Sequence, residues 1–305
     1  GVSCRFPGGA NSLDEYWQLL KEGRDAVIEV PSDRWSLDEY YDPDPDAPGK
    51  MYSKSGGFLK NIKIDEFDAA FFNITPGEAS GMDPEQRLLL EVCWEALENS
   101  AINIENLKKT ITGIFIAKGS NDYAYLTFDD LNNITPYSNS GVANSVAAGR
   151  ISYILGIQGP SMAIDTACSS SLIAIHEACN SLRLGETELA VVAGVALQLS
   201  PATTIGFCKA GMLSVDGRCK TFDASANGYA RGEGAGAIVL KRLSDAKRDG
   251  DIIQAVIRGS ATNQDGASGG LTVPNGPAQE KVINQALLDA NVNPNEINYV
   301  EAHGT

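Results

Sequence analysis

Short apolar runs alternate along this chain with longer segments of helical periodicity, and this alternation limits the fold more than any other feature. The runs fit buried strands, which we predict at residues 112–118, 161–167, 189–199, 236–243, 252–262 and 297–303. Helices are predicted at residues 12–21, 83–100, 169–184 and 278–290. Strands that alternate with helices in this way predict an α/β fold built in layers.

Capping residues support three of these helices. Asp83 and Pro84 supply an N-cap followed by proline at the first helical position, and Pro277 opens the last helix in the same way. Gly185 stands where a left-handed residue would end the helix over 169–184.

Composition narrows the class of protein. The 305 residues are 43% hydrophobic, which is enough for a large core, and no apolar run or signal peptide suggests a membrane. A net charge of −15 argues against nucleic-acid partners. The six cysteines show no metal-site spacing, so we expect no metal, a reduced, cytoplasmic protein, and packing roles for all but one: Cys4, Cys93, Cys168, Cys179, Cys208 and Cys219.

Cys168 is the exception because of the residues around it. An apolar run leads into the thiol, and three serines then open the helix over 169–184. The helix N-terminus stabilises a thiolate, and its free N–H groups can hold an oxyanion on an attacked carbonyl. A lone cysteine is commonly a small buried hydrophobe, but the hydroxyl-rich turn favours a nucleophile here.

The chain has two histidines. His176 lies eight residues after Cys168 on the same helix, roughly 12 Å along its axis, so we interpret it as a packing or surface residue. His303 ends the strand predicted over 297–303, a favoured position for site residues in α/β folds.

Residues 159–172 resemble the active-site segment of β-ketoacyl synthases, and more narrowly that of the ketosynthase domain in modular type I polyketide synthases; they read GPSMAIDTACSSSL. Other segments resemble this family in the same order along the whole chain. They are GVSCRFPGG at 1–9, MDPEQRLLLE at 82–91, GRISY at 149–153, KTFD at 220–223, GEGAG at 232–236 and EAHGT at 301–305.

The resemblance implies a thiolase-like fold of two similar halves in five αβαβα layers. A charged stretch at 241–251 suggests the boundary between them. We expect residues 1–245 to form a nearly complete N-terminal half with the nucleophile, and residues 246–305 to begin a truncated C-terminal half. As a fragment truncated at both ends, the chain is expected to be inactive alone, with apolar surface uncovered at 252–257 and 297–300.

The resemblance also implies an acyltransferase that catalyses decarboxylative Claisen condensation in polyketide chain elongation. Cys168 would carry the acyl group, and His303 would donate to the thioester oxygen of a malonyl-type extender. The family's second histidine and its lysine belong to segments beyond Thr305. No cofactor is expected in this domain, since the phosphopantetheine arm belongs to a partner acyl carrier protein.

Expected partners are that carrier protein, neighbouring synthase domains such as an acyltransferase, and a second copy in a homodimer. Loops 47–60 and 121–140 are candidates for the dimer interface, although 121–140 fits a plain surface loop equally well. No nucleic acid or membrane partner is expected.

Other functions remain possible. A fatty-acid-type condensing enzyme of the same fold is one alternative. A coenzyme A-dependent thiolase-fold enzyme is disfavoured by the segments at 5–7 and 83–87, and a non-catalytic scaffold partner by Cys168. The glycines of 232–236 precede a strand, so close backbone packing is predicted there and not a phosphate loop. Asp165 and Glu233 are expected in buried, hydrogen-bonded roles.

Overall fold

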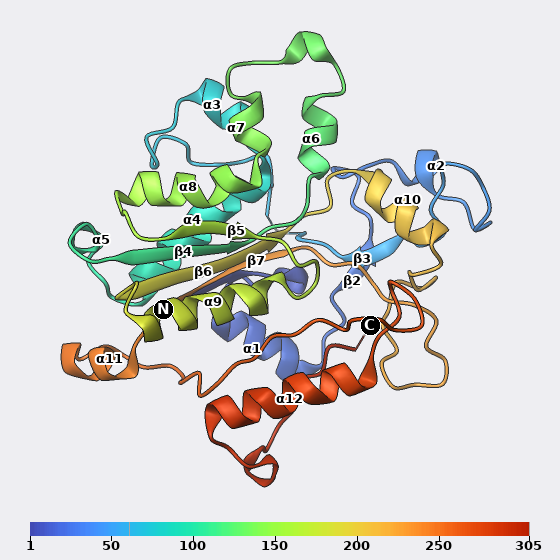
Figure 1. The fold of residues 1–305 in the computed structure, drawn as a ribbon. Coiled ribbons are helices and arrows are strands. Elements are labelled where there is room, and N and C mark those ends of the chain that lie inside the picture. The colour runs from blue at the N-terminus through green and yellow to red at the C-terminus, as the bar shows by residue number, and fades with distance from the viewer. Residues whose placement is uncertain (61, 305) are drawn as a thin grey trace.

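A mixed β-sheet forms the centre of the molecule in the computed structural model, which describes residues 1–60 and 62–304. Within these residues the sheet has five strands in the order β1-β7-β6-β4-β5 (Figure 1). The strands are β1 (Val2–Arg5), β4 (Thr112–Ala117), β5 (Ser161–Ile164), β6 (Leu189–Ala196) and β7 (Gly234–Lys241). A separate small sheet pairs β2 (Val27–Glu29) with β3 (Ser55–Gly57).

Strands β4, β5 and β6 run parallel, with Phe115 opposite both Met162 and Val192. Strand β7 runs antiparallel to β6 and to β1. The carboxyl ends of the three parallel strands therefore meet at one edge of the sheet, where α/β folds commonly place a binding site.

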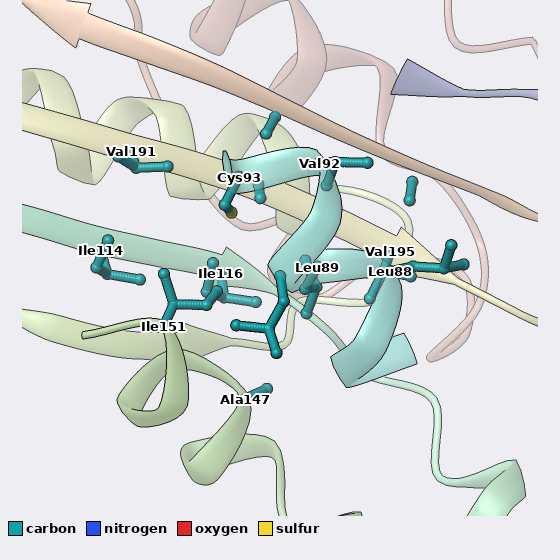
Figure 2. Close-up of a cluster of buried hydrophobic side chains, with 14 of the residues drawn as sticks. Leu88, Leu89, Val92, Cys93, Ile114, Ile116, Ala147, Ile151, Val191 and Val195 are labelled. Atoms are coloured by element: carbon teal, nitrogen blue, oxygen red, sulfur yellow. The ribbon is translucent and has the colours of Figure 1, made fainter. Parts of the chain in front are cut away.

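Helices cover both faces of the sheet. Helices α4 (Pro84–Asn99) and α8 (Asn144–Leu155) pack on one face, and α9 (Ser170–Leu184) lies on the other (Figure 1). Figure 2 shows the first interface, where side chains of α4 and α8 meet alternate strand residues: Leu88, Leu89, Val92, Cys93, Ala147, Ile151, Ile114, Ile116, Val191 and Val195. On the opposite face α9 contributes Ala174, Ala178 and Leu182 to a smaller core.

The side chains of β6 alternate between these two cores. Val191, Ala193 and Val195 belong to the core beneath α4, whereas Ala190 and Val192 face α9. Leu197 and Leu199 also belong to the α4 core, so the alternation continues past the end of the strand.

The remaining helices are short or peripheral, apart from α12. They are α1 (Leu13–Glu22), α2 (Leu37–Tyr40), α3 (Pro76–Gly81), α5 (Ile104–Leu107), α6 (Asp122–Thr127), α7 (Ser138–Val142), α10 (Pro201–Lys209), α11 (Leu243–Asp249) and α12 (Gly276–Ala290), with 3₁₀ turns at Pro7–Gly9, Leu131–Asn133 and Pro294–Glu296. Within the described part of the chain, no helix has the length and apolar character that a bilayer span requires.

The predicted helices and their caps are confirmed. The helices over 12–21, 83–100, 169–184 and 278–290 correspond to α1, α4, α9 and α12. Asp83 caps α4 by accepting from the Glu85 N–H at 2.9 Å, and Gly185 ends α9 with a φ of 75°.

Four of the six predicted strands form, as β4, β5, β6 and β7, and two are wrong. Residues 252–262 and 297–303 form no ladder within the described chain. An apolar run specifies side chains that can be buried, but a strand also needs a neighbour for its backbone, which the run does not specify. Apolar side chains in both segments are exposed, as predicted, among them Ile252, Ile257, Tyr299 and Val300.

Candidate active site

A tight turn carries Cys168 from the end of β5 into α9, and side-chain oxygens hold its backbone. Asp165 Oδ1 accepts from the Ala167 N–H at 3.0 Å. Ser170 Oγ accepts from the Thr166 N–H at 2.8 Å and donates to the Ala167 carbonyl at 2.7 Å. The hydroxyls that predicted a functional turn therefore fix its conformation.

Ala167 has a φ of 55°, in the left-handed region that residues with a side chain rarely adopt. Such a conformation costs roughly 1–2 kcal/mol and persists only where surrounding contacts impose it. Cys168 follows immediately and is exposed, two residues before α9 begins. The strained turn thus presents the thiol to solvent beside the positive end of a helix.

Among the described cysteines, Cys168 and Cys219 are exposed and the other four are buried. The predicted packing role is therefore wrong in one case, Cys219, whose sulfur accepts from the Ala230 N–H at 3.3 Å. Burial raises the pKa of Cys93 to about 12 and also raises the pKa of Cys4 and Cys179, so these thiols stay protonated and unreactive.

Tyr229 lies within electrostatic reach of the Cys168 thiol. Burial raises the pKa of Tyr229, and Arg231 opposes this rise, while Cys168 and Cys208 add to it. Burial also lowers the pKa of Arg231, which donates to Thr204 Oγ1 at 2.7 Å. Sequence reasoning did not identify Tyr229, because no motif connects it with the nucleophile.

The described structure shows no hydrogen-bonded link between His303 and Cys168. His303 is exposed, and no hydrogen bond within residues 1–60 and 62–304 joins the two side chains. The adjacent Gly304 carbonyl accepts from Thr221. The catalytic role of His303 stays a prediction.

His176 has the structural role predicted for it. Its Nδ1 lies 2.8 Å from Ser260 Oγ, and its Nε2 lies 3.0 Å from Asn180 Nδ2. Nδ1 therefore joins α9 to the segment that precedes α12, whereas Nε2 is occupied within α9.

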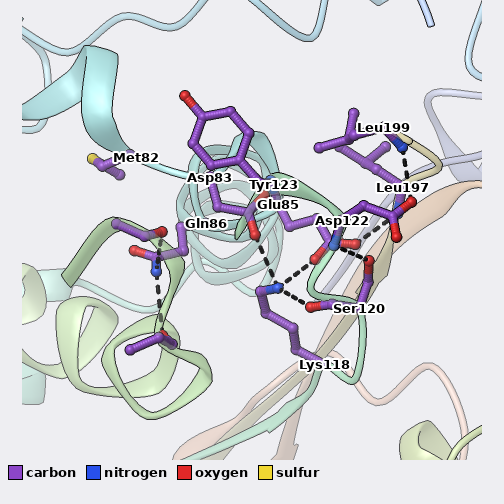
Figure 3. A network of polar contacts seen from close by, with 12 residues as sticks. Met82, Asp83, Glu85, Gln86, Lys118, Ser120, Asp122, Tyr123, Leu197 and Leu199 are labelled. Carbon is purple, nitrogen blue, oxygen red and sulfur yellow. Dashed lines mark hydrogen bonds and ion pairs between the residues drawn. The ribbon is translucent and has the colours of Figure 1, made fainter. Parts of the chain in front are cut away.

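Figure 3 shows a buried ion cluster around Lys118. Lys118, directly after β4, donates to Glu85 Oε2 at 2.5 Å and to the Ser120 carbonyl at 2.8 Å, and Asp83 Oδ2 is 3.0 Å away. Burial raises the pKa of Glu85 to about 8. Burial alone would lower the pKa of Lys118, but the neighbouring Glu85 and Asp83 side chains outweigh it and raise that pKa. Lys118 therefore keeps its charge in the buried cluster.

This cluster supports the Cys168 turn through the residue that follows Lys118. The Lys118 N–H donates to the Ile164 carbonyl at 3.2 Å. Asp165 lies directly against Gly119, where an added Cβ would come within 2.6 Å of Asp165 Oδ1. Asp165 is hydrogen-bonded as predicted but exposed, so the predicted burial is wrong.

Three buried carboxylates hold four consecutive backbone N–H groups after β6. Leu197 donates to Glu85 Oε1 at 2.7 Å and Gln198 to Glu233 Oε1 at 3.1 Å. Leu199 and Ser200 both donate to Asp122 Oδ2, each at 3.2 Å. Figure 3 shows the Glu85 and Asp122 parts of this arrangement. The carboxylates replace the ladder that ends with β6, so the buried backbone stays fully paired.

The buried, hydrogen-bonded role predicted for Glu233 is confirmed. It forms a bidentate pair with Arg34, at 2.8 Å to Nε and 2.9 Å to Nη2, and both side chains have no exposed surface. Glu233 Oε2 also accepts from the Leu59 N–H at 2.9 Å. The glycines beside Glu233 pack closely as predicted, since Gly234 lies against Phe6.

Within the described residues, no group of three or more His, Cys, Asp or Glu side chains is arranged to hold a metal ion. The polar groups at this edge of the sheet instead hold backbone and one another, and the Cys168 thiol beside them is exposed.

Two family models match almost the whole chain. Residues 1–246 match the N-terminal domain of beta-ketoacyl synthases, and residues 254–305 match their C-terminal domain. The chain belongs to the beta-ketoacyl synthase family. It is also 52% identical over 305 residues to the phenolphthiocerol/phthiocerol polyketide synthase subunits C and B of Mycobacterium tuberculosis. All of this chain is covered, but only 17% and 20% of those two proteins.

Solved ketosynthases share the fold. The chain resembles the oxazolomycin ketosynthase domain of Streptomyces albus JA3453 with a TM-score of 0.95, and the module 6 ketosynthase of the bacillaene synthase from Bacillus subtilis 168 with 0.91. Each is 42% identical, and the match covers 100% of this chain and 53% and 50% of theirs. The chain therefore has the thiolase-like ketosynthase fold and spans about half of these solved domains.

Proposed function

We propose that this chain is the nucleophile-bearing part of a ketosynthase domain that extends polyketide chains. The observation that carries the proposal is the exposed Cys168 thiol on a strained turn at the start of α9. Residues 1–245 form the half that carries the nucleophile, and residues 246–305 begin the second half. The ketosynthase relatives with matching folds support this function.

The reaction has two stages. The Cys168 thiolate first attacks the carbonyl of an acyl thioester on the phosphopantetheine arm of a carrier protein, and the carrier's sulfur leaves. A malonyl-type thioester then loses CO₂, and the carbon nucleophile that remains attacks the acyl group on Cys168. A carbon–carbon bond forms, and the cysteine leaves again as thiolate. His303 donates to the extender's thioester oxygen as negative charge develops there.

The partners follow from this chemistry. They are an acyl carrier protein, neighbouring synthase domains such as an acyltransferase, and a second copy in a homodimer. The relatives that are 52% identical to this chain are polyketide synthase subunits much longer than the chain, which supports a multidomain setting. A cytoplasmic location is part of the same proposal.

The test uses the complete domain that contains this chain, in three forms: wild type, Cys168→Ala and His303→Ala. We expect Cys168→Ala to lose both acyl loading and condensation. His303→Ala should still load an acyl group but lose condensation by about 10²-fold or more, since one oxyanion donor is removed. Equal loss of loading and condensation in His303→Ala would contradict the role given to His303. Full loading of Cys168→Ala would contradict the proposed function.

A further inference from the structure

Gln198 carries a buried hydrogen-bond donor that has no partner. The residue is 3% exposed, and its Nε2 has no hydrogen-bond partner in the described structure. Leaving such a donor unpaired costs free energy comparable to a lost hydrogen bond, so native structures rarely keep one without a purpose. Five buried side-chain atoms within the described residues lack a partner, and Gln198 Nε2 is the one among them that follows β6 at the edge of the sheet where Cys168 lies.

The direction of Gln198 follows from its neighbours. Leu197 and Leu199 both pack into the core beneath α4, so Gln198 lies on the opposite face of the sheet. On that face Gly194 of β6 lies against Ser171 of α9, where an added Cβ would come within 2.7 Å of the Ser171 hydroxyl. The unpaired amide therefore lies on the face of the sheet that carries the first turn of α9 and the Cys168 turn.

The same edge of the sheet carries both residues. Gln198 follows β6 by two residues and Cys168 follows β5 by four, and β4 alone separates these parallel strands. Two strand spacings amount to about 10 Å. A side chain as long as glutamine, together with the first carbons of an acyl group on Cys168, suits such a gap.

The backbone of Gln198 is held unusually firmly. Its own N–H donates to Glu233, and its neighbours' N–H groups donate to Glu85 and Asp122. A donor on a backbone fixed in this way loses little conformational freedom when it binds, which makes it suitable for selecting a ligand.

We propose that the Gln198 side-chain amide donates a hydrogen bond to an oxygen near the thioester end of the acyl chain on Cys168. The site would then select acyl chains that carry a β-oxygen over saturated chains. This inference rests on the proposed function, because it assumes that Cys168 carries the acyl group.

The experiment compares two soluble thioester probes of equal length, one 3-hydroxyacyl and one saturated, on the complete ketosynthase domain. The rate constant kcat/KM for acylation of Cys168 is measured for each by mass spectrometry. We expect wild type to favour the hydroxylated probe by about tenfold, the range of one well-formed hydrogen bond. Gln198→Met, which keeps the length but lacks the donor, should reduce this ratio to about one by slowing the hydroxylated probe.

Thr187→Val is the matched control, since Thr187 is fully buried and its Oγ1 is also unpartnered, but it precedes β6 at the opposite end of that strand. Its selectivity ratio should equal that of wild type. If the Met variant does not fold, Gln198→Leu carries the same expectation.

An unchanged ratio in the folded Gln198 variant would mean that the amide binds only water, and would overturn the inference. An equal loss on both probes would show a purely structural role, and would also overturn it. If wild type acylates Cys168 with neither probe, the proposed function itself fails, a result that the two other outcomes do not produce.

Discussion

Replacing Glu233 by alanine should be among the most destabilising single changes outside the apolar core. The substitution leaves the Arg34 guanidinium buried without its bidentate partner, and it frees the buried N–H groups of Leu59 and Gln198. Removing one partner of a buried ion pair typically costs about 3–5 kcal/mol. We therefore expect the free energy of unfolding of the complete domain to fall by about that amount.

The assay is urea unfolding monitored by circular dichroism, with Arg34→Met, Glu233→Leu and the double variant Arg34→Met/Glu233→Leu measured alongside Glu233→Ala. The double variant should cost less than the two single changes together, because it leaves no unpaired charge. Glu66→Ala is the control, since Glu66 pairs with Lys63 at the surface and should leave the midpoint unchanged. A loss below about 1 kcal/mol for Glu233→Ala would refute the reasoning.

Three further predictions concern the turn and the buried cluster. Ala167→Gly should keep or raise the midpoint of thermal unfolding because glycine adopts a φ of 55° freely, whereas Ala167→Val should lower that midpoint. The reverse order of the two midpoints would contradict strain at this turn. Folding raises the pKa of Glu85 to about 8, so its contribution to stability is present below its unfolded pKa and is lost as pH rises through about 8. In urea titrations Glu85→Gln should therefore gain stability relative to wild type between pH 5 and pH 8. A stability difference that stays constant over this range would contradict the raised pKa. Brief alkylation of the native domain should label Cys168 and spare Cys93 in peptide maps, whereas label on Cys93 would show that its burial does not protect it.

Local patterns predicted the parts of the fold that depend on neighbours in sequence. The Asp83-Pro84 cap and the periodicity after it predicted α4, and apolar runs predicted β4 to β7. The residues around Cys168 predicted a turn at a helix start. These features depend on backbone geometry within a few residues, and local sequence patterns predict such geometry directly.

The supporting polar network was not predictable in the same way. Lys118 directly follows the apolar run of β4, and this position is the sequence signal for a buried charge. Its partners Asp83 and Glu85, however, lie more than thirty residues earlier. Asp122 and Arg34 likewise bind groups far along the chain. The segment at 252–262 shows the converse, since its pattern predicted a strand whose partner no local signal supplies. Hydrogen bonds and ion pairs between residues far apart in the chain depend on the assembled fold, so local patterns in one sequence do not predict them.

The central claim is that Cys168 is the residue that carries the acyl group. The most direct measurement is to mix the complete domain with an acyl thioester, trap the acyl-enzyme at low pH, digest it, and locate the added mass by tandem mass spectrometry. The acyl group should lie on the peptide that contains Cys168 and be absent in Cys168→Ala. An acyl group on Cys219 or on any other residue, with Cys168 unmodified, would contradict the account.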